Sequence, residues 1–92
     1  MEQKVIHEKE NERFVIYLDG SGVFVEYSLD DININLHHTY THPELRGKGL
    51  AAHVVRAALE FAKENNMKVI PTCSYVQAFL GKNEEYKELV AE

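Results

Sequence analysis

Apolar residues recur at every second position in the first part of the chain, which is typical of half-buried strands. Val5 and His7 begin a short strand-like piece, and Arg13–Leu18 (RFVIYL) is rich in β-branched and aromatic residues. The turn-forming stretch Asp19–Gly22 (DGSG) separates this run from the next, so the two runs predict an antiparallel hairpin. In the second run one face carries Val23, Val25 and Tyr27, and the other carries Phe24, Glu26 and Ser28.

A third strand is predicted over Ile32–Thr41, after the break at Asp30-Asp31 and before Pro43. Its alternation is regular. Strict alternation predicts one face made of Ile32, Ile34, Leu36, His38 and Tyr40, and another made of Asn33, Asn35, His37, Thr39 and Thr41.

The pattern then changes to a helical period. Leu50, Val54, Ala57, Ala58, Phe61 and Ala62 fall at three- and four-residue spacing, and Asn65-Asn66 ends the run. Met67–Pro71 predicts a short buried strand, Ser74–Leu80 a short helix stopped by Gly81, and Glu84–Val90 a last turn or two. The third strand, the long helix and the next strand form a βαβ unit, so the pattern predicts an α+β fold with a mixed sheet.

Composition narrows the range of functions. A chain of 92 residues is expected to form one domain, residues 1–92, and its hydrophobic and charged fractions of 45% and 27% are ordinary for a globular protein. The net charge of −5 argues against nucleic acid as a partner and suits a cationic one such as an amine. The sequence contains one cysteine, no apolar run of about 18 residues and no apolar N-terminal leader. We therefore expect a cytoplasmic protein that does not contact the membrane.

Residues 42–55 (HPELRGKGLAAHVV) place two glycines directly before the long helix. The first turn of a helix has unpaired N–H groups and a partial positive charge, and glycines let an anion approach them. Arg46 and Lys48 add positive charge at the same place, so the stretch is either an anion site or simply a flexible helix start. The spacing matches neither a P-loop nor the three-glycine dinucleotide fingerprint.

The residues Arg46, Gly49 and Ala51 fit the pattern [QR]-x-x-G-x-[GA], and "LRGKGLA" resembles the acyl-CoA loop of the GNAT N-acetyltransferases. This resemblance implies a GNAT-like, mostly antiparallel mixed sheet with a long helix after the loop and short C-terminal helices. It also implies acetyl-CoA as co-substrate, with loop amides on the pyrophosphate and the preceding strand along the pantetheine arm. The implied binding residues are Leu36, His38, Thr39, Tyr40, Arg46, Gly47, Lys48, Gly49, Leu50, Ala51 and Cys73.

A second stretch narrows the resemblance. Val69–Val76 (VIPTCSYV) is similar to the segment after the fifth strand in a compact GNAT-like subfamily of single domains that carry a cysteine there. The chain has no counterpart of the N-terminal helical region that helps to build the acceptor site in ordinary GNATs. The acceptor is therefore an unidentified amine, either a small molecule or a protein lysine or N-terminus.

Cys73 and His38 are the candidate catalytic residues. A thiol at a helix N-terminus is activated, so Cys73 either accepts the acetyl group covalently, lines the acyl pocket or is a small buried thiol. Neutral imidazole suits deprotonation of an amine, and His38 is preferred over His37 and His42; alternatively it is an ordinary strand histidine. The spacing of these residues does not suit a closed zinc site, so no metal is expected. Tyr75 could protonate a departing thiolate, although packing is the simpler role.

The sequence thus predicts an acetyl-CoA-dependent N-acetyltransferase. The alternative is a non-catalytic module that binds acyl-CoA or another protein and has kept the loop without the acceptor side.

Overall fold

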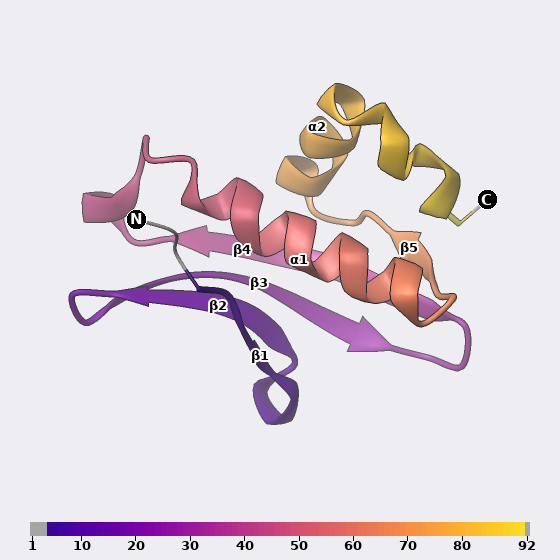
Figure 1. Cartoon of the computed structure of the whole chain (residues 1–92), viewed down its shortest axis with the longest axis horizontal. Coiled ribbons are helices and arrows are strands. Elements are labelled where there is room, and N and C mark those ends of the chain that lie inside the picture. Colours follow the sequence, from indigo (N-terminus) through magenta and orange to yellow (C-terminus); the bar gives the residue numbers. More distant parts are fainter. Residues whose placement is uncertain (1–3, 92) are drawn as a thin grey trace.

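The computed structural model describes residues 4–91 and forms one five-stranded sheet covered by helices on one side (Figure 1). The strands lie side by side in chain order, and every neighbouring pair is antiparallel except the last, which is parallel. The strands are β1 (Ile6–Glu8), β2 (Arg13–Leu18), β3 (Ser21–Leu29), β4 (Asn33–Thr41) and β5 (Lys68–Ile70).

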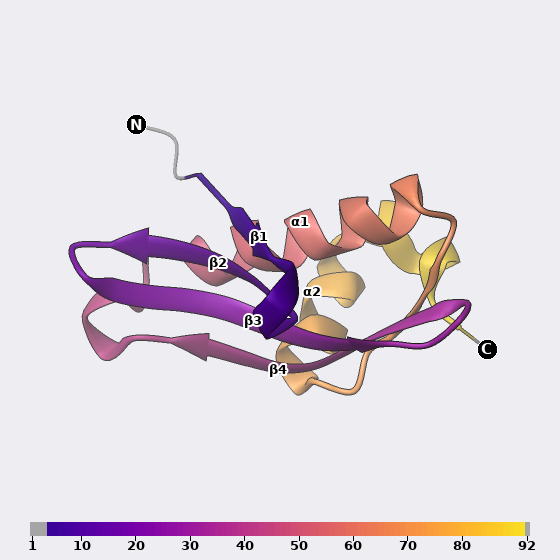
Figure 2. The same cartoon turned by 90° about the horizontal axis from the view of Figure 1, so that it is seen from below.

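The helices gather on a single face of this sheet. The long helix lies against the strands, with the second helix and the C-terminal turns beside it, and the view from below shows strands in front of helices (Figure 2). We call the helix-covered side the core face and the other side the open face. The helices are α1 (Leu50–Glu64) and α2 (Ser74–Lys82), with 3-10 turns η1 (Lys9–Asn11), η2 (Pro43–Leu45) and η3 (Glu84–Leu89).

The core is built where the apolar stripe of α1 meets the core face. The predicted helical period is confirmed, but its buried stripe differs at two places: Val55 and Leu59 are buried, whereas the predicted Ala57 and Phe61 are only partly buried. The fully buried residues of α1 are Leu50, Val54, Val55, Ala58, Leu59 and Ala62. The strands contribute Ile16, Val23, Val25, Ile34 and Leu36 to the same cluster. Hydrophobic burial of this stripe against the sheet is what fixes α1, since propensity alone stabilises a helix only weakly.

The predicted hairpin is confirmed. Asp19 and Gly20 connect β2 and β3, and both have positive φ angles, 52° and 79°. Positive φ at both central residues is the geometry of a type I′ turn, which matches the twist of the strands it joins. Register then places Val23 opposite Ile16 and Val25 opposite Phe14 on the core face.

The prediction of strict alternation along the third strand is wrong beyond Leu36. Leu36 pairs with Tyr27, whereas the next pair is His38 with Glu26, so His37 is an extra residue in β4 that has no partner in β3. Such a bulge exchanges the two faces of the strand from that point on. Ile34 and Leu36 are buried on the core face, but His38 and Tyr40 lie on the open face, opposite Glu26 and Phe24.

Two smaller expectations also change. Ile32 lies outside β4 and is 66% exposed, so it does not belong to the core. Gly81 does not stop the short helix, because α2 continues through it to Lys82, where Asn83 ends it. Over residues 4–91 no helix combines the length and the apolar character needed to cross a bilayer.

Candidate functional site

The loop between β4 and α1 is shaped by its two glycines. Gly47 and Gly49 have φ angles of 80° and 73°, a conformation that glycine adopts without the penalty paid by other residues. A Cβ atom built on either one would meet nothing within 4 Å, so the space over the loop is open. Gly49 is also the N-cap of α1, whose first turn contains no acidic residue and no side-chain cap.

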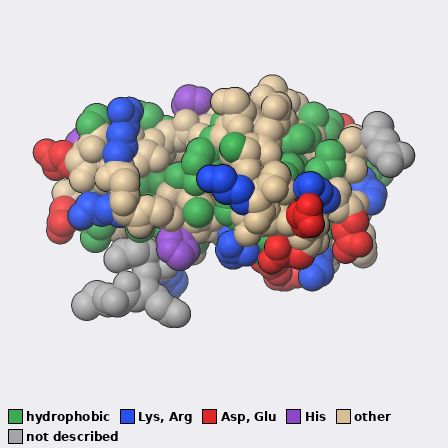
Figure 3. Space-filling model, turned by 90° about the horizontal axis from the view of Figure 1, so that it is seen from above, with side chains coloured by type: hydrophobic (Ala, Val, Ile, Leu, Met, Phe, Trp, Pro, Cys, Tyr) green, Lys and Arg blue, Asp and Glu red, His purple; other side chains and the backbone are tan. Residues whose placement is uncertain are grey.

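The amide groups of this loop are free. Within the described residues, no acceptor is paired with a backbone N–H from Gly47 to Ala51. Arg46 donates from Nε to the carbonyl oxygen of Thr41 at 3.4 Å, and both it and Lys48 are exposed. Lys and Arg side chains stand at the end of the molecule that carries the loop (Figure 3). Free amides, a helix N-terminus and two cations together favour an anion at this point.

A shallow pocket of about 180 Å³ opens beside the loop. Its lining joins the loop to the end of β4 and to α2, and it consists of Thr41, Leu45, Arg46, Gly47, Gly49, Leu50, Ala51 and Tyr75. Tyr75 is 38% exposed, so it belongs to this pocket wall and not to the core, and its partial burial raises the pKa of its hydroxyl. The pocket is small for a whole nucleotide but sufficient for a phosphate group beside the loop.

The edge of β4 is open next to the pocket. β5 pairs only with Asn33–Asn35, and the last bond across this edge runs from the Cys73 amide to the Leu36 carbonyl oxygen at 3.0 Å. His42 donates its amide to Gly22 on the β3 side. Backbone groups alternate along a strand, so those of Thr39 and Thr41 face the opposite side, where β5 has departed. An extended chain could therefore pair with this edge.

Cys73 lies where the open edge meets the N-terminus of α2. Its Sγ is 3.4 Å from the Thr39 hydroxyl, and the first-turn amides of Tyr75 and Val76 face it, without a cap hydrogen bond of full geometry. Burial raises the pKa of the Cys73 thiol, but hydrogen bonds from the Thr39 hydroxyl and from the amides of Val76, Tyr75 and Thr39 outweigh burial, and the pKa is lowered overall. The thiolate form is thus favoured relative to an ordinary cysteine.

The structure brings most of the predicted binding residues together. Arg46, Gly47, Gly49, Leu50 and Ala51 line one pocket, and Lys48 lies in the same loop. Leu50 is buried, so only its amide can face a ligand.

Three of the remaining predicted residues are placed differently from the expectation. The side chain of Leu36 is 0% exposed in the core, and its carbonyl oxygen already accepts from Cys73. Because of the bulge, His38 and Tyr40 lie on the open face, so they do not share a face with Leu36. Thr39, which strict alternation placed on the face opposite Leu36, shares the core face with Leu36 after the bulge and lies beside Cys73.

Three residues of the pocket lining, Thr41, Leu45 and Tyr75, were not among the predicted binding residues. Thr41 supplies a backbone edge, and Tyr75 supplies a wall of the pocket. The position of Tyr75 two residues after Cys73 was the available signal, since both belong to the start of one short helix. No group of three His, Cys, Asp or Glu side chains in the described part of the chain is arranged to hold a metal ion.

Comparison with known proteins finds a matching family model and related sequences. A family model described as GCN5-related N-acetyl-transferase matches residues 13–89. The protein NATD1 of Danio rerio is 32% identical over 83 residues, covering 87% of this chain and 76% of that protein. Human NATD1 is 32% identical over 84 residues, covering 87% and 74%.

A solved structure is similar as well. The NMR solution structure of a GCN5-like protein from Staphylococcus aureus superposes with a TM-score of 0.76 at 28% identity, covering 97% of this chain and 88% of that one. The GNAT-like α+β fold predicted from the sequence is therefore confirmed. With free loop amides before α1, an open strand edge and a matching family model over residues 13–89, the chain belongs to the GCN5-related N-acetyltransferase family.

Proposed function

We propose that this protein binds acetyl-CoA and transfers the acetyl group to an amine. The observation that carries the proposal is the run of free backbone amides from Gly47 to Ala51 beside the open edge of β4. Family membership indicates an acyl-CoA as the co-substrate. Three features of this chain suit acetyl-CoA: the loop before α1, the open edge of β4 and the Cys73 thiol.

The loop suits the pyrophosphate. The N–H groups of the loop have no acceptor, and a Cβ built on Gly47 or Gly49 would touch nothing, so the space around the two glycines is open. Arg46 and Lys48 bring positive charge to a molecule whose net charge is −5, which raises the local affinity for a dianion. In this proposal the free amides from Gly47 to Ala51 hold the phosphate oxygens, and Arg46 and Lys48 neutralise their charge with their side chains.

The strand edge suits the pantetheine arm, which contains amide groups. Thr39 and Thr41 offer backbone donors and acceptors on the side that β5 has left. An extended arm pairing with this edge would run from the loop toward Cys73 and carry the thioester to the N-terminus of α2. Thr39 and Cys73 would then line the acyl group.

Transfer would follow by direct attack. The neutral amine nitrogen forms a bond to the thioester carbonyl carbon, the carbon–sulfur bond breaks, and the proton lost by the amine ends on the leaving thiolate. His38 lies on the open face, whereas Thr39 and Cys73 face the other side, so in this proposal water rather than His38 carries that proton. Amides at the start of α2 would stabilise the negative charge that develops on the carbonyl oxygen.

A matched pair of glycine variants tests the loop. Gly49→Ala places a Cβ at a positive φ, which costs about 1–2 kcal/mol in the loop, so we expect acetyl-CoA affinity to fall about tenfold. Gly81→Ala is the control, because Gly81 lies inside α2 with open space around it and a normal helical conformation. Calorimetric titration measures both affinities.

A second measurement keeps the proposal testable if Gly49→Ala disturbs folding. In the unaltered protein, amide resonances of residues 47–51 should shift when coenzyme A is added at millimolar concentration. Unmoved resonances, or equal affinity in the Gly49→Ala and Gly81→Ala variants, would contradict the proposal.

Activity is tested by release of free thiol from acetyl-CoA over a panel of amines and lysine peptides. Acceptor-dependent release supports the transferase, and binding without release supports the non-catalytic module. Intact mass after incubation with acetyl-CoA alone distinguishes the routes, since an added acetyl group on Cys73 would replace direct attack by covalent transfer.

A further inference from the structure

We infer that Thr39 is a positioning residue that Cys73 and the coenzyme use in turn, so that pairing of the pantetheine arm with β4 moves the Cys73 side chain away from Thr39. The inference rests on the proposed function and deepens it, because it says how the thiol responds when the coenzyme binds at the same strand edge.

Thr39 presents two hydrogen-bonding groups to the sulfur at the edge of β4. Its hydroxyl lies 3.4 Å from the Cys73 Sγ. Its backbone N–H also faces outward, because the amide of His42 bonds to Gly22 on the β3 side and backbone groups alternate along a strand. This amide is directed at the same sulfur atom and, with the hydroxyl, lowers the pKa of the thiol. The sulfur therefore lies where a chain added along β4 would place its carbonyl oxygen on Thr39.

The backbone of Cys73 is fixed at both of its polar groups. Its amide donates to the Leu36 carbonyl oxygen at 3.0 Å, and its carbonyl oxygen accepts from the Gln77 amide at 3.1 Å, at the start of α2. One rotatable bond, χ1, sets the position of Sγ, and the cysteine is only partly buried. Displacement of the sulfur from Thr39 is therefore a side-chain rotation that requires no movement of β4 or α2.

The two occupants of Thr39 are coupled through the charge of Cys73. The Thr39 donors stabilise the thiolate more than the neutral thiol, because hydrogen bonds to charged groups are the stronger ones. Rotation away from Thr39 removes these donors, so coenzyme binding should favour the neutral thiol. Coupling between two binding equilibria is reciprocal, so ionisation of Cys73 should weaken coenzyme binding by the same factor.

Other titratable and charged groups belong to the same elements and the neighbouring loop. Tyr75 lies on α2, and partial burial raises the pKa of its hydroxyl. His38 lies on β4 but on the open face. Arg46 and Lys48 lie in the loop before α1. A variant that lacks the Cys73 thiol keeps all four groups, so it separates their titration from that of the thiol.

Titration of Cys73 with and without a coenzyme analogue tests the coupling. The sequence contains one cysteine, so a carbon-13 label at the cysteine Cβ reports the ionisation of this thiol alone. The probe is desulfo-coenzyme A, which keeps the pantetheine arm but has no thiol and no acyl group. Saturation with the probe should raise the midpoint of the titration by about one pH unit, as expected when a thiolate loses its hydrogen bonds. An unmoved midpoint in a protein that binds the probe would overturn the inference and leave the proposed function standing.

Substitutions of Thr39 separate a positioning role from a purely structural one. Thr39→Val keeps the shape of the side chain without the hydroxyl, so the midpoint without the probe should rise and the shift on binding should become smaller. Thr39→Ser is the matched control, because it keeps the hydroxyl and should keep both values. Equal midpoints in the Thr39→Val variant and the unaltered protein would contradict the positioning role.

Calorimetric titration tests the reciprocal effect. The affinity of the unaltered protein for desulfo-coenzyme A should fall by up to about tenfold as the pH rises through the pKa of the thiol, which is the same factor as a shift of about one unit. Cys73→Ala should bind the probe without this loss. Equal pH dependence in the two proteins would overturn the inference alone, whereas no binding at any pH would overturn the proposed function together with it.

Discussion

The two faces of the sheet each carry a histidine among aromatic rings, and they differ in what covers them. On the core face His7 stacks on Phe14 with ring centres 4.1 Å apart, meets the edge of Phe61 at 4.8 Å and bonds to the Tyr27 hydroxyl at 2.6 Å. The helices described within residues 4–91 lie on the other side of the sheet from the open face (Figure 2), where the ring centres of His38 and Phe24 are 6.1 Å apart.

The comparison shows that aromatic residues and histidine stabilise the fold where a helix covers them. Where no helix covers them, the same residue types remain accessible to ligands. Phe14 is 4% exposed and Tyr27 3%, so the core-face rings contact protein on all sides. Tyr40 is 39% exposed, and the carboxylate next to His38 has no partner among residues 4–91. The buried aromatic cluster on the core face stabilises the fold by packing. The aromatic cluster on the open face keeps exposed surface that a ligand can contact.

The largest expected effect is the difference in stability loss between substitutions of Phe14 and Phe24. Phe14→Ala removes a buried ring from the core and should lower the free energy of unfolding by about 3–5 kcal/mol. Phe24→Ala acts on the half-buried open face and should cost less than about 2 kcal/mol. Urea denaturation followed by circular dichroism measures both. Equal losses would show that the open face is as much a core as the helix-covered one.

A smaller effect concerns pH. Burial, and then the nearby charge of Lys9, lower the pKa of His7 below its usual range near 6.5. The unfolded chain therefore binds a proton that the folded protein does not, so stability is full above about pH 6.5 and falls as the pH is lowered through the folded pKa. Thermal unfolding between pH 7.5 and 5 should show this loss.

The matched variants are His7→Gln and His38→Gln. His7→Gln should reduce the pH dependence, because the titrating group is gone, whereas His38→Gln should keep it. An unchanged slope in the His7 variant would assign the pH effect to other groups.

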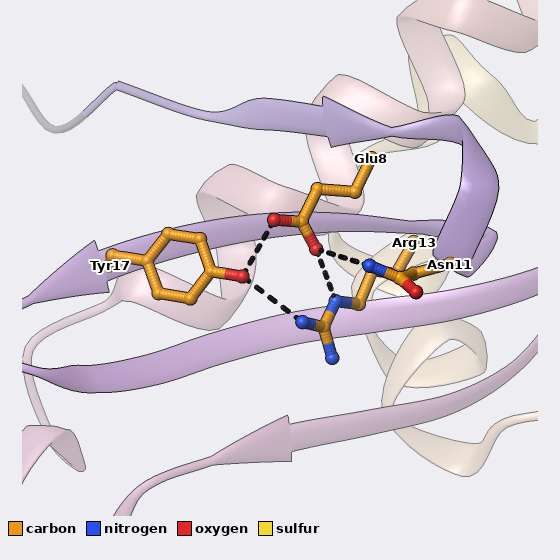
Figure 4. A network of polar contacts seen from close by, with 4 residues as sticks. All are labelled: Glu8, Asn11, Arg13 and Tyr17. Atoms are coloured by element: carbon orange, nitrogen blue, oxygen red, sulfur yellow. Dashed lines mark hydrogen bonds and ion pairs between the residues drawn. The ribbon is translucent and has the colours of Figure 1, made fainter.

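The smallest effect is expected from the polar network of Glu8, Arg13 and Tyr17 on the open face (Figure 4). Glu8→Gln breaks the ion pair between Glu8 and Arg13, and both of these side chains are partly exposed. The loss in free energy of unfolding should therefore be well below that of Phe14→Ala, and it should shrink further in high salt. Urea denaturation at low and at high salt measures this loss, and a loss equal to that of Phe14→Ala would contradict the expected order.

Local pattern was sufficient for much of the fold. Alternation predicted β3, the DGSG stretch predicted the turn at Asp19 and Gly20, and the helical period predicted α1 from Leu50. These features depend on residues close in sequence, since turn chemistry and side-chain period are local properties. The glycine loop was predicted for the same reason, because glycines before a helix report a backbone conformation directly.

The arrangement of the site depended on distant partners. Nothing local to residues 33–41 marks His37 as an extra residue, because the bulge appears only when β4 is paired with β3. The contact of Thr39 with Cys73 joins residues 34 positions apart, and it needs β5 to leave the sheet where it does.

By itself, the sequence determined the element order, the helical stripe, the loop that exposes its amides and the family to which these belong. Tertiary structure alone decided which side chains of β4 face the thiol and which face the open side. The physical reason is that a strand's period of two assigns residues to faces only relative to one another. Pairing with a neighbouring strand sets the register, and one unpaired residue exchanges the faces of all the residues that follow it.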